Sequence, residues 1–314
     1  QQVLRRWSHW PALCGACDNT LRTEPNNYEG EHMRTNDVRL GISGDIHKLA
    51  SIARAFRQEK DHPFSNIHHF SLGLRPWEVL DEALIDFLKK QNITLSAHPT
   101  DINFSGRLNI TELKLLSKTL KPWPVLYIEE DMGLWRTGKL FLGAHQLNPV
   151  MNKTSLHKTK LNIVDASEIL ELPITVENPP IYYEAGNIDF WDYYLDLCTF
   201  SNSQMAFDIG HYIGYCKSQN QSPVYSLPFH DLCNLIRTVH ISGIKSWRWN
   251  GIAVWLDQHA DEFKTPSLTL LKTAVERSCN ISNILLEMEG ASASAEANNI
   301  ERVSTLLSEH LYHE

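Results

Sequence analysis

The pattern of apolar and polar positions changes at about residue 37. Beyond it, short apolar runs typical of buried strands alternate with stretches in which apolar residues recur every three or four positions, as in amphipathic helices. The predicted strands are Val38–Ile42, Ile67–Leu72, Ile93–Ala97, Val125–Ile128, Ile174–Val176, Met205–Phe207, Thr238–Ile241 and Ile284–Leu286. The predicted helices are Ile46–Gln58, Trp77–Lys90, Glu112–Leu120, Ser155–Leu170, Phe190–Phe200, Leu227–Leu235, Ser267–Ser278 and Asn298–Leu311. Each predicted strand is followed by one predicted helix.

This alternation favours an α/β fold, a (β/α)8 TIM barrel, because strand–helix units repeated along one chain of this length most simply close into a barrel. A doubly wound open sheet is the competing arrangement. No G-x-G-x-x-G turn follows the first predicted strand, which disfavours a dinucleotide-binding version of that sheet. Residues 1–36 are rich in Asn, Arg, Trp and Glu without sustained periodicity. We therefore predict an N-terminal extension over residues 1–36 and a barrel over residues 37–314.

Composition and charge narrow the class of protein. The 314 residues are 42% hydrophobic and 21% charged, as in folded globular chains. We find neither a secretory signal pattern nor an apolar run long enough for a membrane helix, so we expect a cytoplasmic protein without a membrane partner. A net charge of −8 argues against nucleic acid as a partner. The six cysteines are scattered except for Cys14-x-x-Cys17, which is either half of a metal site, a redox pair or a simple structural or free pair.

The ends of the predicted strands carry acidic residues and histidines, where the chemistry of a barrel is found. Each has an ordinary alternative role; Asp208, for example, could cap the helix that follows it. Together they would repel one another at one barrel mouth unless cations compensated their charge. The sequence therefore predicts a multinuclear metal site with oxygen and nitrogen ligands, a set that suits iron, manganese or zinc. The strand-end residues are His98, Glu129-Glu130-Asp131, Glu177, Asp208-x-x-His211, His240, Asp257-x-His259 and Glu287.

The order of these residues resembles the xylose isomerase-like barrel superfamily and, within it, the MbnB/TglH-like family of multinuclear non-haem iron-dependent oxidative enzymes. The resemblance covers roughly residues 93 to 310. The family's Leu-Glu-Asn-Pro motif on strand 5 is similar to Thr175–Pro180, and its apolar-Pro turn to Leu147–Val150. Its histidine motif on strand 7 resembles His240–Gly243, and its Asp-x-His loop before a strand ending in Glu resembles Asp257–His259 before Glu287.

Two positions depart from the family pattern. The family usually has a histidine just past strand 4, which by position Asp131 replaces here. The family also has an asparagine three residues after the strand-6 aspartate, where this chain has His211, as endonuclease IV does. His98-Pro99 is similar to strand 3 of the endonuclease IV-like nucleases. Exchanging an imidazole for a carboxylate favours harder, more oxophilic ions, so the number and identity of the metals stay open.

The resemblance implies a centre of two or three iron ions that uses O2 to modify a ribosomally made precursor peptide at a cysteine or C-terminal residue, with zinc or manganese as alternative metals. It also implies a partner protein that presents the peptide. Glu177 is the expected bridge between ions, Asn178 and Ser242 are candidates to orient ligands, and Glu129, Glu130 and His145 are candidate acid or base groups. The hypothesised metal ligands are His98, Asp131, Glu177, Asp208, His211, His240, Asp257, His259 and Glu287.

Three alternatives stay open on the sequence. An endonuclease IV-like zinc phosphodiesterase would use the Asp-x-x-His and Asp-x-His pairs to hold clustered zinc, although the net charge of −8 counts against a DNA substrate. A sugar isomerase or epimerase would need one divalent metal, which leaves many of the ligand-type residues unused. A barrel kept only as a binding scaffold would hold no metal. Metal content separates these classes.

Overall fold

The computed structural model describes residues 38–58, 63–78, 81–142, 147–180, 184–223, 232–250, 252–259, 262–278 and 280–311. The predicted N-terminal extension, with Cys14 and Cys17, lies outside the described residues, as does His145.

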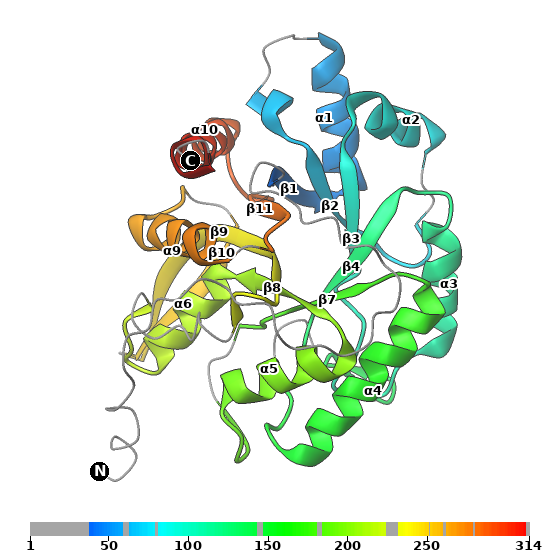
Figure 1. The fold of residues 1–314 in the computed structure, drawn as a ribbon, viewed down its shortest axis with the longest axis vertical. Coiled ribbons are helices and arrows are strands. Elements are labelled where there is room, and N and C mark those ends of the chain that lie inside the picture. Colours follow the sequence, from blue (N-terminus) through cyan, green and yellow to red (C-terminus); the bar gives the residue numbers. More distant parts are fainter. Residues whose placement is uncertain are drawn as a thin grey trace, which may run out of the picture. The chain divides into compact units, whose positions relative to one another are not determined.

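The described strands form a barrel. One nine-stranded sheet contains β10, which is antiparallel to its neighbour, and eight mutually parallel strands that pair in the closed order β9-β11-β1-β2-β3-β4-β7-β8-β9 (Figure 1). This confirms the predicted TIM barrel. The parallel strands are β1 (Arg39–Asp45), β2 (His69–Gly73), β3 (Thr94–His98), β4 (Val125–Asp131), β7 (Ile174–Glu177), β8 (Gln204–Asp208), β9 (Ile236–Trp249) and β11 (Asn283–Glu287).

Helices follow the strands and surround the barrel (Figure 1). Polar side chains begin several of them: Asp81 accepts a hydrogen bond from the Ala83 N–H at the start of α2, and Asn152 does the same for Ser155 in α4. No helix among the described residues is long and apolar enough to cross a membrane. The helices are α1 (Ile46–Gln58), the short 3-10 helix η2 (Pro63–Asn66), α2 (Glu82–Gln91), α3 (Ile110–Leu120), α4 (Lys153–Leu170), α5 (Phe190–Ser201), α6 (Ile209–Ser218), α9 (Thr265–Arg277) and α10 (Ala293–Leu311).

The helix predicted over Leu227–Leu235 lies mostly outside the described residues, and the structure contains a helix, α6, that was not predicted. Residues 224–231 lie outside the described part, and the helix that follows β8 is α6, which begins directly after Asp208. Residues 209–216 of α6 are all buried, so the helix lacks the alternation of buried and exposed positions that marks an amphipathic helix. A helix buried on every side has no amphipathic signature.

Two short additions interrupt the alternation of strands and helices. β10 (Ile252–Gln258) folds back on the outer half of β9, so Asp257, predicted in a loop, lies in a strand. Between β4 and α4, β5 (Arg136–Thr137) and β6 (Leu140–Phe141) form a small hairpin. β10 matters for the site because its register places Asp257 opposite Ile244, just beyond the strand end that carries His240.

Several polar side chains are buried inside the barrel below its mouth. Successive side chains of a strand point to opposite faces, so β2 turns His69 and Ser71 to one face and its apolar residues to the other. The hydroxyl of Tyr127 lies 3.2 Å from Thr238 Oγ1, and Asn283 Nδ2 donates to that hydroxyl at 2.7 Å. These buried side chains form a hydrogen-bonded layer inside the barrel, below the strand ends that carry the cluster.

Candidate metal centre

The strand ends bring all nine hypothesised ligands into one cluster. They belong to β3, β4, β7, β8, β9, β10, β11 and the first turn of α6, with His259 directly after β10. Such a convergence of segments far apart in sequence is what closure of the barrel produces. Six of them line a cavity of about 210 Å³: His98, Asp131, Glu177, His211, His259 and Glu287.

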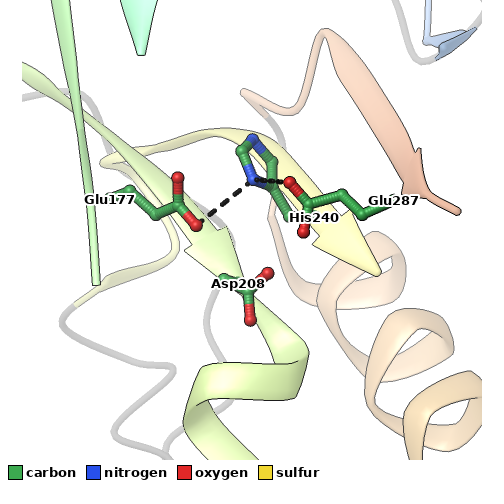
Figure 2. A group of neighbouring side chains, drawn as sticks. All are labelled: Glu177, Asp208, His240 and Glu287. Atoms are coloured by element: carbon green, nitrogen blue, oxygen red, sulfur yellow. Dashed lines mark ion pairs between the residues drawn. The ribbon is translucent and has the colours of Figure 1, made fainter. Parts of the chain in front are cut away.

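Four overlapping groups of these side chains have the spacing of metal sites, since the ligand atoms within each group lie within 4.8 Å of one another. Figure 2 shows the most buried group, in which Glu177 and Glu287 approach His240 from opposite sides and Asp208 lies close by. Because the groups share members, they form one continuous cluster. The groups are Glu177, Asp208, His240 and Glu287; His98, Asp131 and Glu177; Asp208, His211 and Asp257; and Asp257, His259 and Glu287.

Glu177 connects two of these groups through its separate carboxylate oxygens. Its Oε2 lies 3.1 Å from His98 Nε2, whereas its Oε1 lies 3.4 Å from His240 Nδ1 and 3.5 Å from His211 Nδ1. The side chain is buried at the end of β7, which lies next to β4 and β8 in the barrel. A carboxylate that offers its two oxygens to different imidazoles has the geometry needed to bridge two cations.

Glu287 makes a second connection of this kind. Its Oε1 lies 3.2 Å from His240 Nδ1, and its Oε2 lies 3.4 Å from His259 Nε2. The same His259 nitrogen lies 2.7 Å from Asp257 Oδ2, which in turn lies 3.6 Å from His211 Nε2. Carboxylates and imidazoles therefore alternate around the whole cluster.

Crowding of carboxylates shifts the protonation of the site. Burial, followed by the charges of Asp257 and Glu287, raises the pKa of Asp208 well above its ordinary value. Burial alone would lower the pKa of His98, but its hydrogen bond to Glu177 and the nearby negative charges raise that pKa to about 10. Both pKa shifts arise from the negative charge of neighbouring carboxylates, which favours the binding of protons or cations in this pocket.

The donor chemistry fits bound cations. Asp208 Oδ2 and His98 Nδ1 are buried without a hydrogen-bond partner among the described residues, which is costly unless another group binds them. The four groups found in the described part of the chain contain carboxylate oxygens and imidazole nitrogens and no cysteine sulfur. This donor set suits iron, manganese or zinc.

The two predicted orienting residues contact ligands. The Asn178 side chain exchanges two hydrogen bonds with the backbone of Asp208, and the Asn178 carbonyl accepts a hydrogen bond from His211 Nδ1 at 2.8 Å. The Ser242 hydroxyl donates to Asp257 Oδ1. Asp208 also caps α6, since its Oδ1 accepts from the His211 N–H. Both the capping role and the place in the cluster therefore hold for this residue.

Glu129 and Glu130, two of the three candidate acid or base groups, do not line the cavity. Glu129 is fully buried below the cluster, where it accepts hydrogen bonds from Ser71 and Ser96. Burial would raise the pKa of Glu129, but the hydrogen bond and charge of His240, with other nearby histidines, lower it to about 2. Glu130 is also fully buried and, because side chains alternate along a strand, lies on the other face of β4. Neither glutamate is among the residues that line the cavity.

Sequence reasoning missed two residues of the site. Glu289 lines the cavity, and its Oε2 lies 2.6 Å from His259 Nδ1. Its position two residues after Glu287, at the same end of the predicted strand, could have indicated that it belongs to the site. Gly210 permits the close approach of α6, because a Cβ atom there would lie 2.3 Å from Ser242 Oγ and 2.7 Å from Asp257 Oδ1.

Comparison with solved structures supports the fold. At a TM-score of 0.54 and 10% identity, the chain is similar to a xylose isomerase-like TIM barrel protein from Mycobacterium smegmatis in complex with magnesium, covering 89% of this chain and 99% of that one. At a TM-score of 0.50 and 11% identity, it is similar to a sugar phosphate isomerase/epimerase from Parabacteroides distasonis, covering 84% and 92%. These likenesses support the TIM-barrel fold.

Sequence comparison identifies the family. A search of curated proteins found no match. The family described as "RiPP precursor modification enzyme MbnB/TglH/ChrH", which acts on the precursors of ribosomally synthesised and post-translationally modified peptides, matches residues 57–308. That span includes every residue of the cluster. The chain therefore belongs to the MbnB/TglH/ChrH family of RiPP precursor modification enzymes.

Proposed function

We propose that this chain is a multinuclear non-haem iron enzyme that uses O2 to modify a precursor peptide at a cysteine or C-terminal residue. The observation that carries the proposal is the continuous cluster of carboxylates and imidazoles at the barrel mouth of a chain in a peptide-modifying enzyme family. A site for one divalent ion would leave most of these side chains without a cation, since the cluster contains four overlapping groups.

The ligand assignment follows the groups. His98, Asp131 and Glu177 would hold one iron, and Glu177 would bridge to a second held with Asp208, His240 and Glu287. The remaining ligand-type side chains, His211, Asp257 and His259, would complete the site and hold a third ion where three are bound.

Bound iron would supply one-electron redox chemistry and an open position for O2 or a substrate thiolate. The side chains of this chain control access to that position. The His259 side chain is 35% exposed, whereas that of His240 is fully buried. The peptide would therefore approach from the His259 side, while the buried side excludes water. We further propose that a partner protein presents the peptide, as the resemblance to this family implies.

Metal analysis of anaerobically purified protein tests the proposal first. We expect two or three irons per chain, with a Mössbauer spectrum of coupled ions. Protein carrying stoichiometric zinc, or no metal after supply with iron, would contradict it. With iron present, O2 consumption and a mass change should both require a precursor peptide.

Variants test the ligands themselves. Glu177→Ala and His240→Ala should each lose metal while far-UV circular dichroism shows a folded barrel. His157→Ala and Glu168→Ala are matched controls, because both residues are exposed on α4. Full metal retention in both ligand variants would refute the assignment.

A further inference from the structure

We propose that Glu129 is a positioning residue that orients His240 toward the metal cluster from below. Glu129 belongs to none of the four candidate metal groups and does not line the cavity. It would act through the imidazole of His240. The inference rests on the proposed metal site, but it depends neither on which metal binds nor on the peptide reaction.

The two nitrogens of the His240 ring face different carboxylates. Nε2 lies 3.4 Å from Glu129 Oε1, while Nδ1 lies 3.4 Å from Glu177 and 3.2 Å from Glu287. An imidazole binds a cation through a nitrogen that carries no proton, so its proton must lie on the other nitrogen. An acceptor next to Nε2 keeps the proton there and leaves Nδ1 for the cluster. Glu129 supplies that acceptor.

The Glu129 carboxylate is itself held in place from two neighbouring strands. The hydroxyls of Ser71 on β2 and Ser96 on β3 donate to its Oε2 at 2.8 and 2.9 Å. Ser96 Oγ also lies 3.0 Å from Nε2 of His69, so the contact continues into the polar layer of the barrel. Such anchoring fixes the other oxygen, Oε1, beneath His240.

The cost of burying this carboxylate points to a role. Glu129 is fully buried, and within the described residues its only ion pair is with His240. A buried carboxylate without a lysine or arginine partner is unfavourable for folding, and a hydrophobic side chain would serve a barrel core better. An action of this charge on His240 gives the buried carboxylate a role.

Two other histidines of the cluster show the same arrangement. His259 Nδ1 lies 2.6 Å from Glu289 Oε2, while its Nε2 faces Asp257. His211 Nδ1 donates to the Asn178 carbonyl, while its Nε2 faces Asp257. In each case one ring nitrogen is held by an oxygen acceptor and the other is directed to the cluster. His240 differs in that its acceptor is charged and completely buried.

Anaerobic titration with Co²⁺ alone tests the inference, because the visible absorption of Co²⁺ reports its ligands. In Glu129→Gln we expect one class of Co²⁺ to bind about 10- to 100-fold more weakly, with an altered spectrum. Glu129→Asp should restore part of the affinity, since the charge returns on a shorter side chain. Glu168→Gln, on the exposed face of α4, is the control and should match the wild type.

A purely structural role gives a different result. It would lower the urea stability of the metal-free protein and leave the Co²⁺ affinity and spectrum unchanged, which would overturn the inference. If Glu129→Gln does not fold, the Ser71→Ala/Ser96→Ala double variant frees the carboxylate without removing it and should show a smaller loss of Co²⁺ affinity; wild-type affinity in that variant would overturn the inference. Wild-type protein that binds no Co²⁺ would instead refute the metal site on which the proposed function stands.

Discussion

The side chain of Asn178 holds the backbone of Asp208 through two hydrogen bonds. Asn178 Nδ2 donates to the Asp208 carbonyl at 3.0 Å, and the Asp208 N–H donates to Asn178 Oδ1 at 2.8 Å. The pair ties the segment after β7 to the end of β8, where a ligand-type residue begins α6. Asn178 therefore positions two members of the cluster: its side-chain amide holds Asp208, and its main-chain carbonyl accepts a hydrogen bond from His211.

Replacing Asn178 with Ala should lower the free energy of unfolding by about 2–4 kcal/mol, because two buried backbone groups of Asp208 lose their partners. Urea unfolding followed by circular dichroism measures this loss. Asn178→Asp retains the acceptor, but it sets a buried carboxylate oxygen against the Asp208 carbonyl, so it should not restore the stability of the wild type. A loss below about 1 kcal/mol in Asn178→Ala would show that the pair is unimportant.

Gly210→Ala should destabilise the protein by about 1–3 kcal/mol and weaken metal binding. The added methyl group would meet Ser242 Oγ at 2.3 Å and Asp257 Oδ1 at 2.7 Å, so Asp257 must move. Gly214→Ala is the matched control in the same helix, because its methyl group would meet only the Trp255 carbonyl oxygen, at 3.4 Å. Equal stability and equal metal content in the two variants would contradict the close approach of α6.

Glu177→Gln should remove more metal than His259→Gln. Glu177 offers an oxygen to each of two groups, whereas His259 belongs to one. We expect the Glu177 variant to lose more than one ion per chain and the His259 variant to lose at most one. Elemental analysis after gel filtration measures both. Equal losses would mean that Glu177 is not a bridge.

His69 should make the protein less stable in mild acid. Burial lowers the pKa of His69 from its ordinary 6.5 to about 4, with Arg39 and Arg237 acting in the same direction and Glu129 opposing. Between these two values the unfolded chain takes up a proton that the folded chain does not. The free energy of unfolding therefore falls as the pH falls from 6.5 to 4, by about 3 kcal/mol from this residue.

The measurement compares wild type with His69→Gln by urea unfolding at several pH values, so that the contributions of other titrating groups cancel. The wild type should lose more stability than the variant across that interval. Parallel pH profiles would show that His69 is not held neutral in the fold.

Most of the fold was predictable from local pattern. Every predicted strand overlaps a parallel strand of the barrel, because a strand packed on its outer face by helices keeps apolar residues there. The exception among the helices was α6, whose burial on all sides removes the periodic contrast. β10 was not predicted, because its pairing with β9 is a tertiary contact that local periodicity does not indicate.

The candidate site was predictable as a set of residue types. The members of the cluster could be predicted from the acidic residues and histidines at the strand ends, because parallel strands of a barrel end at one mouth. The roles of individual glutamates were not predictable in the same way. Glu129, Glu130 and Asp131 are consecutive in sequence, and only the alternation of side chains across β4 separates them.

The pattern along the chain predicted the barrel, the resemblance pointed to the family, and the strand ends gave the carboxylates and histidines that the barrel brings into one cluster. Only the tertiary structure decided which oxygen of Glu177 faces which histidine, that Glu289 contacts His259, and that Glu129 lies beneath His240. The physical reason is closure of the sheet. Contacts between side chains of different strands depend on the register and tilt of the closed barrel, which no single segment encodes.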